Sequence, residues 1–346
     1  MKYFLYNLAT DKYRGFFAAI FKFFLLLLSF IYGLIVRVLI FFNRLAVCRL
    51  DCKVISVGNI TLGGTGKTSL VEFIARYLKE KGRKVAVISR GYKRKAATMG
   101  DEPYMLSQKL GDVPVLVDPD RRRAAKQAEE KYGVDTVILD DAFQQWRIGK
   151  DLEVVAIDAT DPFGNRHLLP RGILREPLSS LKRADVLVLT KTNLNPDIQD
   201  IKDFLSQVNP QAEVFEAIHK PMDFYNLREP VKILKTDALK TKSVALFSGI
   251  GDPDSFQNLI LSLGIDIGLS FEFPDHHNYT KEDLEKIVRG CRNKNIDTLV
   301  TTEKDAVRLG ALQLAAYNVQ FFVLRIQLEI KDEQRFYNRL LKLYSL

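Results

Sequence analysis

The chain has 346 residues, which is too long for one typical core and favours two domains. A hydrophobic fraction of 47% and a charged fraction of 27% are ordinary for a globular protein, which excludes extensive disorder. Six of the nine net positive charges lie in the first 50 residues, which hold seven basic side chains and one acidic one. Basic charge around an apolar segment favours an anionic membrane surface as partner and argues against nucleic acid.

The first predicted element is an apolar helix within residues 15–42. Its uncharged run over residues 23–36 has 14 residues, whereas a spanning helix needs about 20. Lys22 and Arg37 flank the run, and their long side chains would extend it to a marginal span. No small-residue cleavage pattern follows, which argues against a signal peptide. We expect residues 1–50 to form a membrane-associated segment that either spans the bilayer or lies in the interface.

Beyond residue 50, short Val/Ile/Leu-rich runs alternate with charged stretches of helical length. This pattern indicates parallel sheets covered on both faces. The predicted strands are Lys53–Val57, Val85–Ser89, Val113–Val117, Thr136–Leu139, Val154–Ile157, Val186–Leu189, Val244–Ser248, Leu269–Phe273, Thr298–Thr301 and Val319–Leu324. The rhythm breaks between Thr192 and Lys242, so we predict an α/β domain over 51–220 and a smaller α/β domain over 221–346.

A glycine-rich segment follows the first predicted strand: Thr61-Leu62-Gly63-Gly64-Thr65-Gly66-Lys67-Thr68. Glycines let successive N–H groups turn toward phosphate oxygens, and a helix beginning near Lys67 adds the positive end of its dipole. Lys67 would reach the β- and γ-phosphates, and the Thr68 hydroxyl would bind Mg²⁺. The strict P-loop pattern has Gly where this chain has Thr61, but the strand–loop–helix context still predicts a nucleoside triphosphate site.

Four further motifs carry polar side chains. The predicted strand Val137–Leu139 ends in Asp140 and Asp141, the form of a Walker B element that holds Mg²⁺. Asp140 is the stronger metal candidate, whereas Asp141 could serve the metal, the acceptor or only a helix cap. Two loop motifs, Ser89-Arg90-Gly91-Tyr92 and Gly100-Asp101-Glu102-Pro103, would lie near the ligand-binding sheet edge, where Asp101 and Glu102 could act as base or metal ligand; a plain polar loop is the alternative.

The remaining two motifs contain arginines and histidines. In the segment 169–177, Arg171 and Arg175 could bind phosphate, although an ion pair with Glu176 would explain them equally. In the segment 273–279, His276 and His277 are adjacent and point in different directions, so only one is expected to act as a base or to tune a carboxylate. A loop that leads into a helix is the alternative.

Taken together, these motifs resemble the tetraacyldisaccharide 4′-kinases, the lipid A kinases of Gram-negative bacteria. The similar stretches occur in the family's order and cover nearly the whole chain. They are Gly58–Thr68, Ser89–Tyr92, Gly100–Pro103, Asp140-Asp141, Phe163-Gly164-Asn165, Leu174–Pro177, Phe247–Gly251, Pro274–His277 and Thr301–Ala306. Thr61 is also the residue that this family has at the start of its P-loop.

The resemblance implies a two-lobed kinase attached by its N-terminal helix to the cytoplasmic face of the inner membrane. The sequence does not determine the oligomeric state, and a monomer is favoured. The kinase would use ATP and Mg²⁺ to phosphorylate the 4′-hydroxyl of a tetraacylated glucosamine disaccharide 1-phosphate, a lipid A precursor, giving lipid IV-A. In the family, residues matching Asp101 and His276 deprotonate that hydroxyl. Residues matching Lys67, Thr68, Glu102, Asp141 and Glu176 serve the phosphates, the metal or the substrate in the family. Our full set of candidates is Lys67 and the P-loop residues 61–68 for phosphate, Thr68, Glu102, Asp140 and Asp141 for the metal, and Arg90, Arg171, Arg175, Glu176 and His277 for the substrate.

Some positions depart from the family pattern. Ala142 and Gln145 stand where the family commonly has Gly and His, and Arg166 and Arg171 replace residues that are usually small. The rival interpretation is a membrane-associated P-loop ATPase or GTPase switch without a lipid acceptor. Leu62 argues against it, because partitioning ATPases carry a signature Lys there, and residues 190–193 lack the Asn and Asp of a GTPase base reader.

Overall fold

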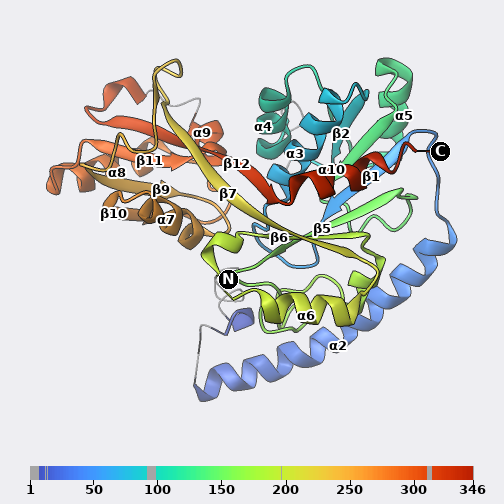
Figure 1. The fold of residues 1–346 in the computed structure, drawn as a ribbon. Coiled ribbons are helices and arrows are strands. Elements are labelled where there is room, and N and C mark those ends of the chain that lie inside the picture. The colour runs from blue at the N-terminus through green and yellow to red at the C-terminus, as the bar shows by residue number, and fades with distance from the viewer. Residues whose placement is uncertain are drawn as a thin grey trace. The chain divides into compact units, whose positions relative to one another are not determined.

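The computed structural model describes residues 8–11, 13, 15–91, 99–195, 197–309 and 314–345, so Tyr92 of the third motif lies outside the described residues. The chain forms two compact units (Figure 1). Unit 1 comprises residues 1–94, 109–218 and 330–346, and unit 2 comprises residues 95–108 and 219–329. Both units are built on parallel strands, as the apolar runs predicted.

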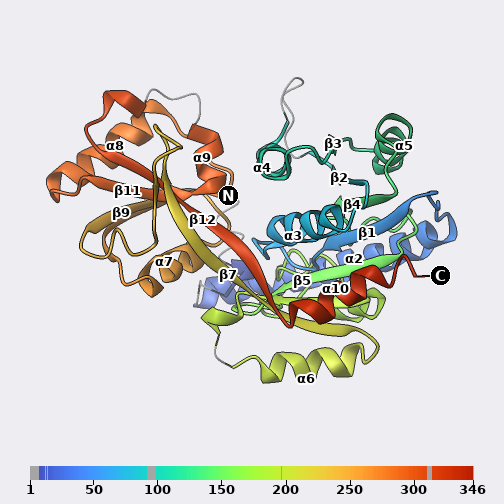
Figure 2. The same cartoon turned by 45° about the horizontal axis from the view of Figure 1, so that its top comes forward.

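Unit 1 has a parallel sheet with strand order β7-β6-β5-β1-β4-β2-β3. Its elements, which can be followed in Figures 1 and 2, are β1 (Lys53–Gly58), α3 (Lys67–Glu80), β2 (Val85–Ser89), β3 (Val115–Val117), α5 (Arg121–Tyr132), β4 (Thr136–Asp140), β5 (Leu152–Asp158), β6 (Val186–Thr190), α6 (Gln199–Val208), the first part of β7 (Glu213–Asn226) and α10 (Glu333–Leu341). Strand β1 lies between β4 and β5, so both of its edges are paired and the loop after it starts from a fixed point.

Unit 2 has the strand order β10-β9-β11-β12, followed by the end of β7. Its elements are α4 (Asp101–Leu110, of which 101–108 belong here), β8 (Ile233–Leu234), β9 (Ser243–Ser248), α7 (Pro253–Ser262), β10 (Asp266–Glu272), α8 (Lys281–Asn293), β11 (Thr298–Thr302), α9 (Glu303–Leu309) and β12 (Gln320–Lys331). Two hydrophobic clusters of its own form around Phe247 and Phe322. Each unit therefore has its own core.

The units depart from the ranges 51–220 and 221–346 in two places. Residues 95–108 belong to unit 2, where Arg308 donates to Asp101. Residues 330–346 return to unit 1, where Phe336 of α10 packs edge-on against Phe73 and Phe215 with ring centres 5.9 and 5.1 Å apart. These returns depend on tertiary packing, which spacing along the chain does not reveal.

Strand β7 was not expected from the sequence. Buried positions occur at its two ends, whereas its middle has exposed residues at Lys220 and Met222 and includes Pro221, so no continuous apolar run marks it. The same reason hid the second half of β12, which continues past the predicted end at Leu324 to Lys331. Both strands contain residues of both units, and buried residues there are interspersed with exposed ones, as at Leu328, Glu329 and Ile330, so the apolar signal is weaker.

The apolar N-terminal segment forms one helix, α2 (Phe16–Leu45), of 30 residues. Its buried residues follow a single stripe: Leu25, Ser29, Gly33 and Val36. Many of its large apolar side chains are exposed, including Phe16, Phe30 and Phe42. Among the described residues it is the one helix whose length and composition would allow it to cross a membrane. The predicted apolar helix is therefore present, and one stripe of its side chains packs against the rest of unit 1.

Candidate active site

The P-loop joins β1 to α3, and its backbone has the conformation that its glycines permit. Gly63 and Gly66 have φ values of 118° and 77°, in the left-handed region that favours glycine. Gly66 precedes α3, so Lys67 and Thr68 form the first turn of that helix and its N–H groups are available to an anion. Thr190 at the end of β6 donates to the Thr65 carbonyl at 3.1 Å and ties the loop to the sheet edge.

The strand leading into the P-loop is paired with the arginine segment. Leu62 donates its N–H to the Ile173 carbonyl at 2.8 Å, and Arg175 donates to the Ile60 carbonyl at 2.7 Å. Thr61 and Leu174 form an antiparallel bridge between these two contacts. Two motifs more than 100 residues apart in the sequence are therefore held side by side, with Arg175 beside the phosphate-binding loop.

Asp141 connects the two motifs. Its carboxylate lies 2.9 Å from Nη1 of Arg175 and 3.7 Å from Nζ of Lys67. Burial raises the pKa of Asp141, but the charges of Lys67 and Arg175 outweigh it and hold that pKa below its ordinary value. The ionised carboxylate thus lies where it orients both cations, and its backbone has φ 46°, an uncommon value for a residue other than glycine.

Asp140 has a different environment. It is 2% exposed at the end of β4, and Ser89 donates to its Oδ2 at 3.4 Å. Arg121, which is also buried, donates to the backbone carbonyls of Asp140 and Asp141 at 2.5 and 3.0 Å. The backbone that carries the two adjacent carboxylates is therefore held in place by a buried guanidinium, and Asp141 is the more exposed of the pair.

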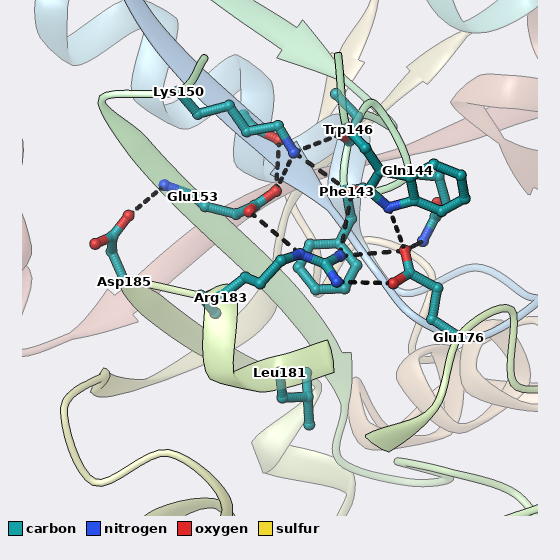
Figure 3. A network of polar contacts seen from close by, with 12 residues as sticks. Phe143, Gln144, Trp146, Lys150, Glu153, Glu176, Leu181, Arg183 and Asp185 are labelled. Atoms are coloured by element: carbon teal, nitrogen blue, oxygen red, sulfur yellow. Dashed lines mark hydrogen bonds and ion pairs between the residues drawn. The ribbon is translucent and has the colours of Figure 1, made fainter. Parts of the chain in front are cut away.

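Glu176 lies at the centre of a buried polar network (Figure 3). Its side chain is fully buried and accepts from Arg183 at 2.9 and 3.2 Å, from Trp146 at 3.2 Å and from Gln144 at 3.1 Å. Arg183 also lies over the Phe143 ring, 4.2 Å from its centre. Glu176 therefore pairs with Arg183, and neither Arg171 nor Arg175 forms the ion pair with Glu176 that was the alternative expectation.

The same network fixes the loop after Asp141. Lys150 donates to the carbonyls of Ala142 and Phe143 at 2.9 and 3.4 Å and forms an ion pair with Glu153. Burial lowers the pKa of Lys150 and raises that of Glu153, so each of these charges depends on the other. Ala142, one of the departures from the family pattern, is fully buried and contributes its carbonyl to this arrangement.

Arg90 and Arg171 occupy different places in unit 1. Arg90 is exposed directly after β2. Arg171 pairs with Asp11, with 3.0 Å between Nη2 and Oδ1, and its N–H donates to Ser29 of α2 at 3.0 Å. Arg171, another of the departures from the family pattern, therefore connects its segment to the N-terminal region, while Arg175 in the same segment lies beside the P-loop.

Unit 2 brings Asp101 and His276 together. The Asp101 carboxylate begins α4, and its Oδ2 lies 3.6 Å from Nδ1 of His276. Arg308 donates to the same Asp101 oxygen at 2.8 Å and lies 3.2 Å from Nδ1 of His276. His276 and Arg308 lower the pKa of Asp101 to about 2, although burial acts in the opposite direction. His276, with φ 60°, is thus the histidine placed beside the carboxylate.

The neighbouring residues have other partners. Nε2 of His277 lies 2.8 Å from the Asp283 carboxylate, and the His277 ring stacks on Phe273 with ring centres 4.7 Å apart. The His277 side chain is therefore held against the start of α8. Glu102 forms an ion pair with Lys304 at the start of α9. Glu102 and His277 thus contact protein groups in unit 2, and neither is part of the Asp101–His276 pair.

Comparison with known proteins places this site in a family. The family model described as tetraacyldisaccharide-1-P 4′-kinase matches residues 21–345. The chain belongs to this family. A tetraacyldisaccharide 4′-kinase of Halothermothrix orenii is 36% identical and covers 95% of this chain and 94% of the relative. One of Syntrophobacter fumaroxidans is 41% identical over 75% of this chain and 72% of the relative.

A solved structure has the same fold. The crystal structure of Aquifex aeolicus LpxK in complex with ATP is 29% identical to this chain, with a TM-score of 0.73, and covers 94% of this chain and all of that protein. The alignment therefore extends over both units of this chain. Its N-terminal helix is part of the aligned family region from residue 21 onward.

In this member of the 4′-kinase family, the donor set fits a nucleoside triphosphate and Mg²⁺. The cation of Lys67 and the N–H groups of the glycine-rich turn suit phosphate oxygens. Mg²⁺ in such sites takes one or two carboxylates together with the phosphates, and Thr68, Asp140 and Asp141 are oxygen donors of that kind. Among the described residues, no group of three or more His, Cys, Asp or Glu side chains is placed to hold a metal without such help.

Several site residues were missed from the sequence. Arg308, Arg183, Lys150 and Lys304 are single basic residues outside any glycine-rich or strand-end motif. Thr301–Ala306, which includes Lys304, was the one signal, because the stretch resembles the family without having an assigned role. Arginine and lysine are usually exposed, so their burial beside carboxylates becomes evident only in the tertiary structure.

Proposed function

We propose that this chain transfers the γ-phosphate of ATP to the 4′-hydroxyl of a tetraacylated glucosamine disaccharide 1-phosphate, a step of lipid A biosynthesis. The observation that carries the proposal is the Lys67–Asp141–Arg175 cluster beside the P-loop. Membership of the 4′-kinase family supports the choice of acceptor. The curated relatives that cover nearly the whole chain have this activity in their names.

Unit 1 would bind the nucleotide. Thr61–Thr68 would surround the phosphates, and Lys67 would neutralise charge on the β- and γ-phosphates. When bound, Mg²⁺ would neutralise the charge that develops on the transferred group, and Thr68, Asp140 and Asp141 would hold it. Arg175, directed by Asp141, would add a second cation next to the transferred phosphate.

Unit 2 would supply the base. The Asp101 carboxylate would take the proton of the 4′-hydroxyl as the new O–P bond forms and the bond to ADP breaks, and His276 would orient the carboxylate through the contact of its Nδ1 with Oδ2. A pKa of about 2 keeps Asp101 in the ionised form that a base requires at neutral pH. Arg308 would hold the Asp101 and His276 side chains next to each other, since it contacts both.

The acyl chains of the substrate would stay in the bilayer at the cytoplasmic face of the inner membrane. The exposed phenylalanines of α2 supply an apolar surface, and the exposed Arg37 and Arg44 supply charges that suit anionic headgroups, whereas Lys22 pairs with Asp11. Attachment through α2 would keep the enzyme near its substrate and leave both units in the aqueous phase.

The test is a transfer assay with purified full-length protein. We expect labelled γ-phosphate to move from ATP to the disaccharide 1-phosphate in the presence of Mg²⁺, and the transfer to stop with excess EDTA. ATP hydrolysis that needs no lipid, with no labelled lipid product, would instead support the ATPase switch. We further expect Asp101→Ala and His276→Ala to lower kcat by about 10²-fold or more while ATP affinity stays near wild type. Asp266→Ala, an exposed carboxylate of unit 2, is the matched control.

A further inference from the structure

Helix α2 touches the segment that carries Arg175 through two polar side chains. The Tyr32 hydroxyl donates to the backbone carbonyl of Arg175 at 2.8 Å. One turn earlier, the Ser29 hydroxyl donates to the Leu168 carbonyl at 2.8 Å and accepts from the Arg171 N–H at 3.0 Å. These contacts lie along the buried stripe of the helix, while its large apolar side chains remain exposed.

Helix α2 packs closely against the segment that contains Leu168 and Arg171. A Cβ at Gly33 would lie 2.7 Å from Cδ1 of Leu168, so a larger residue there would require the Leu168 side chain to shift. Ser29 is 5% exposed, and its hydroxyl accepts from the Arg171 N–H and lies within hydrogen-bond distance of two carbonyls, that of Leu168 at 2.8 Å and that of Leu25 in its own helix at 2.9 Å. A helix that served only to attach the protein to a membrane would not need hydrogen bonds to the backbone groups of Leu168 and Arg171.

From Arg175 a short chain of contacts leads to the nucleotide site. The Arg175 guanidinium binds Asp141 at 2.9 Å, and Asp141 lies 3.7 Å from Lys67. The next residue, Glu176, is fully buried and accepts from Trp146. The path from α2 to the P-loop lysine therefore runs through one tyrosine hydroxyl, one backbone carbonyl and two ion pairs, all within unit 1.

We propose that Tyr32 and Ser29 are positioning residues: α2 sets the place of Arg175, and therefore of the Asp141–Lys67 pair, as well as attaching the protein to a lipid surface. The inference rests on the kinase function proposed above. A helix seated on the bilayer by its exposed side would thus hold the phosphate-binding arginine by its buried side. Loss of the Tyr32 hydroxyl would leave membrane attachment intact and impair turnover.

The first experiment compares Tyr32→Phe with wild type and with Phe30→Leu, a change at an exposed position of the same helix. A net hydrogen bond of ordinary strength predicts a fall in kcat of about three- to tenfold for Tyr32→Phe, with KM for ATP within about twofold. Sedimentation with vesicles of phosphatidylglycerol and phosphatidylethanolamine should be the same for all three proteins. Wild-type kcat in Tyr32→Phe, or loss of vesicle binding by it, would overturn the proposal.

A second readout does not require the kinase reaction. Trp146 is the only tryptophan of the chain, and its Nε1 donates to Glu176 at 3.2 Å. We expect acrylamide to quench Trp146 fluorescence more strongly in Tyr32→Phe and in Ser29→Ala, and equally in Phe30→Leu and wild type. Unchanged quenching in both variants would refute the positional link. Absence of labelled lipid from wild type would refute the proposed function alone, because the quenching result stands without it.

Discussion

We expect the stability of unit 2 to depend more strongly on Arg308 than on its other residues. Its side chain is 2% exposed, and it contacts Asp101 at 2.8 Å, the fully buried Asp305 at 3.1 Å and the Gly249 carbonyl at 2.7 Å. Arg308→Met keeps an unbranched apolar side chain over the first four heavy atoms and removes the charge and all of the donors. The Asp305 carboxylate would then be buried without a cation.

The size of the effect follows from what remains around Asp305. Tyr279 still donates to it at 3.0 Å and Thr302 at 2.7 Å. Removing one partner of a buried ion pair costs about 3–5 kcal/mol, and the remaining donors place this case near the lower end. We therefore expect the free energy of unfolding to fall by about 3 kcal/mol, measured by urea denaturation followed by circular dichroism.

Arg325→Met is the matched control in the same unit. Arg325 forms a two-point ion pair with Asp223, but its side chain is 40% exposed, so water replaces the lost contact. A pair of this kind is worth about 0–1 kcal/mol. If Arg308→Met destabilises the protein no more than Arg325→Met does, the interpretation of Arg308 as a buried support is wrong.

The same variant has a pH dependence. His276 and Arg308 lower the pKa of Asp101 to about 2, below its ordinary value of 3.8. A lowered carboxyl pKa stabilises the folded state fully above about pH 4, and the stabilisation is lost as the pH falls toward 2. Arg308→Met should raise the pKa of Asp101, so the variant lacks part of this stabilisation. Wild type loses the stabilisation as the pH falls. The difference in free energy of unfolding between wild type and Arg308→Met should therefore become smaller from pH 6 to pH 3. A difference that stays constant or widens would contradict this reasoning.

Two further predictions concern unit 1. Gly58→Ala would place a Cβ 2.5 Å from the backbone nitrogen of Phe143, so we expect a loss of about 1–3 kcal/mol in thermal unfolding, whereas Gly64→Ala, with nothing within 4 Å, should unfold near wild type. Arg183→Met would remove the cation from the fully buried Glu176, and we expect a loss of about 3–5 kcal/mol together with a shifted Trp146 emission. Lys182→Met, at the adjacent exposed position, should change neither the stability nor the Trp146 emission. If Lys182→Met has the same effects as Arg183→Met, the interpretation that Arg183 supports the Glu176 network is wrong.

The sequence by itself determined the elements whose signals are local. The P-loop was evident because its glycines, lysine and threonine must follow one another for the backbone to surround a phosphate. The buried parallel strands were evident because both of their faces need apolar side chains, as in β1 and β4. The apolar helix α2 was evident from its composition, and the ordered set of motifs was sufficient to indicate the family.

Only the tertiary structure decided which charges meet. Arg175 and Arg171 lie four residues apart and look equivalent in the sequence, yet one binds Asp141 beside the P-loop and the other binds Asp11 near α2. The structure also placed His276, and not His277, beside Asp101. A salt bridge depends on the meeting of two side chains that can be 200 residues apart, and a local pattern contains no information about its partner. Periodicity and turn chemistry therefore predicted the scaffold, whereas the pairing of buried charges, including the contact of Tyr32 with the Arg175 carbonyl, required the folded chain.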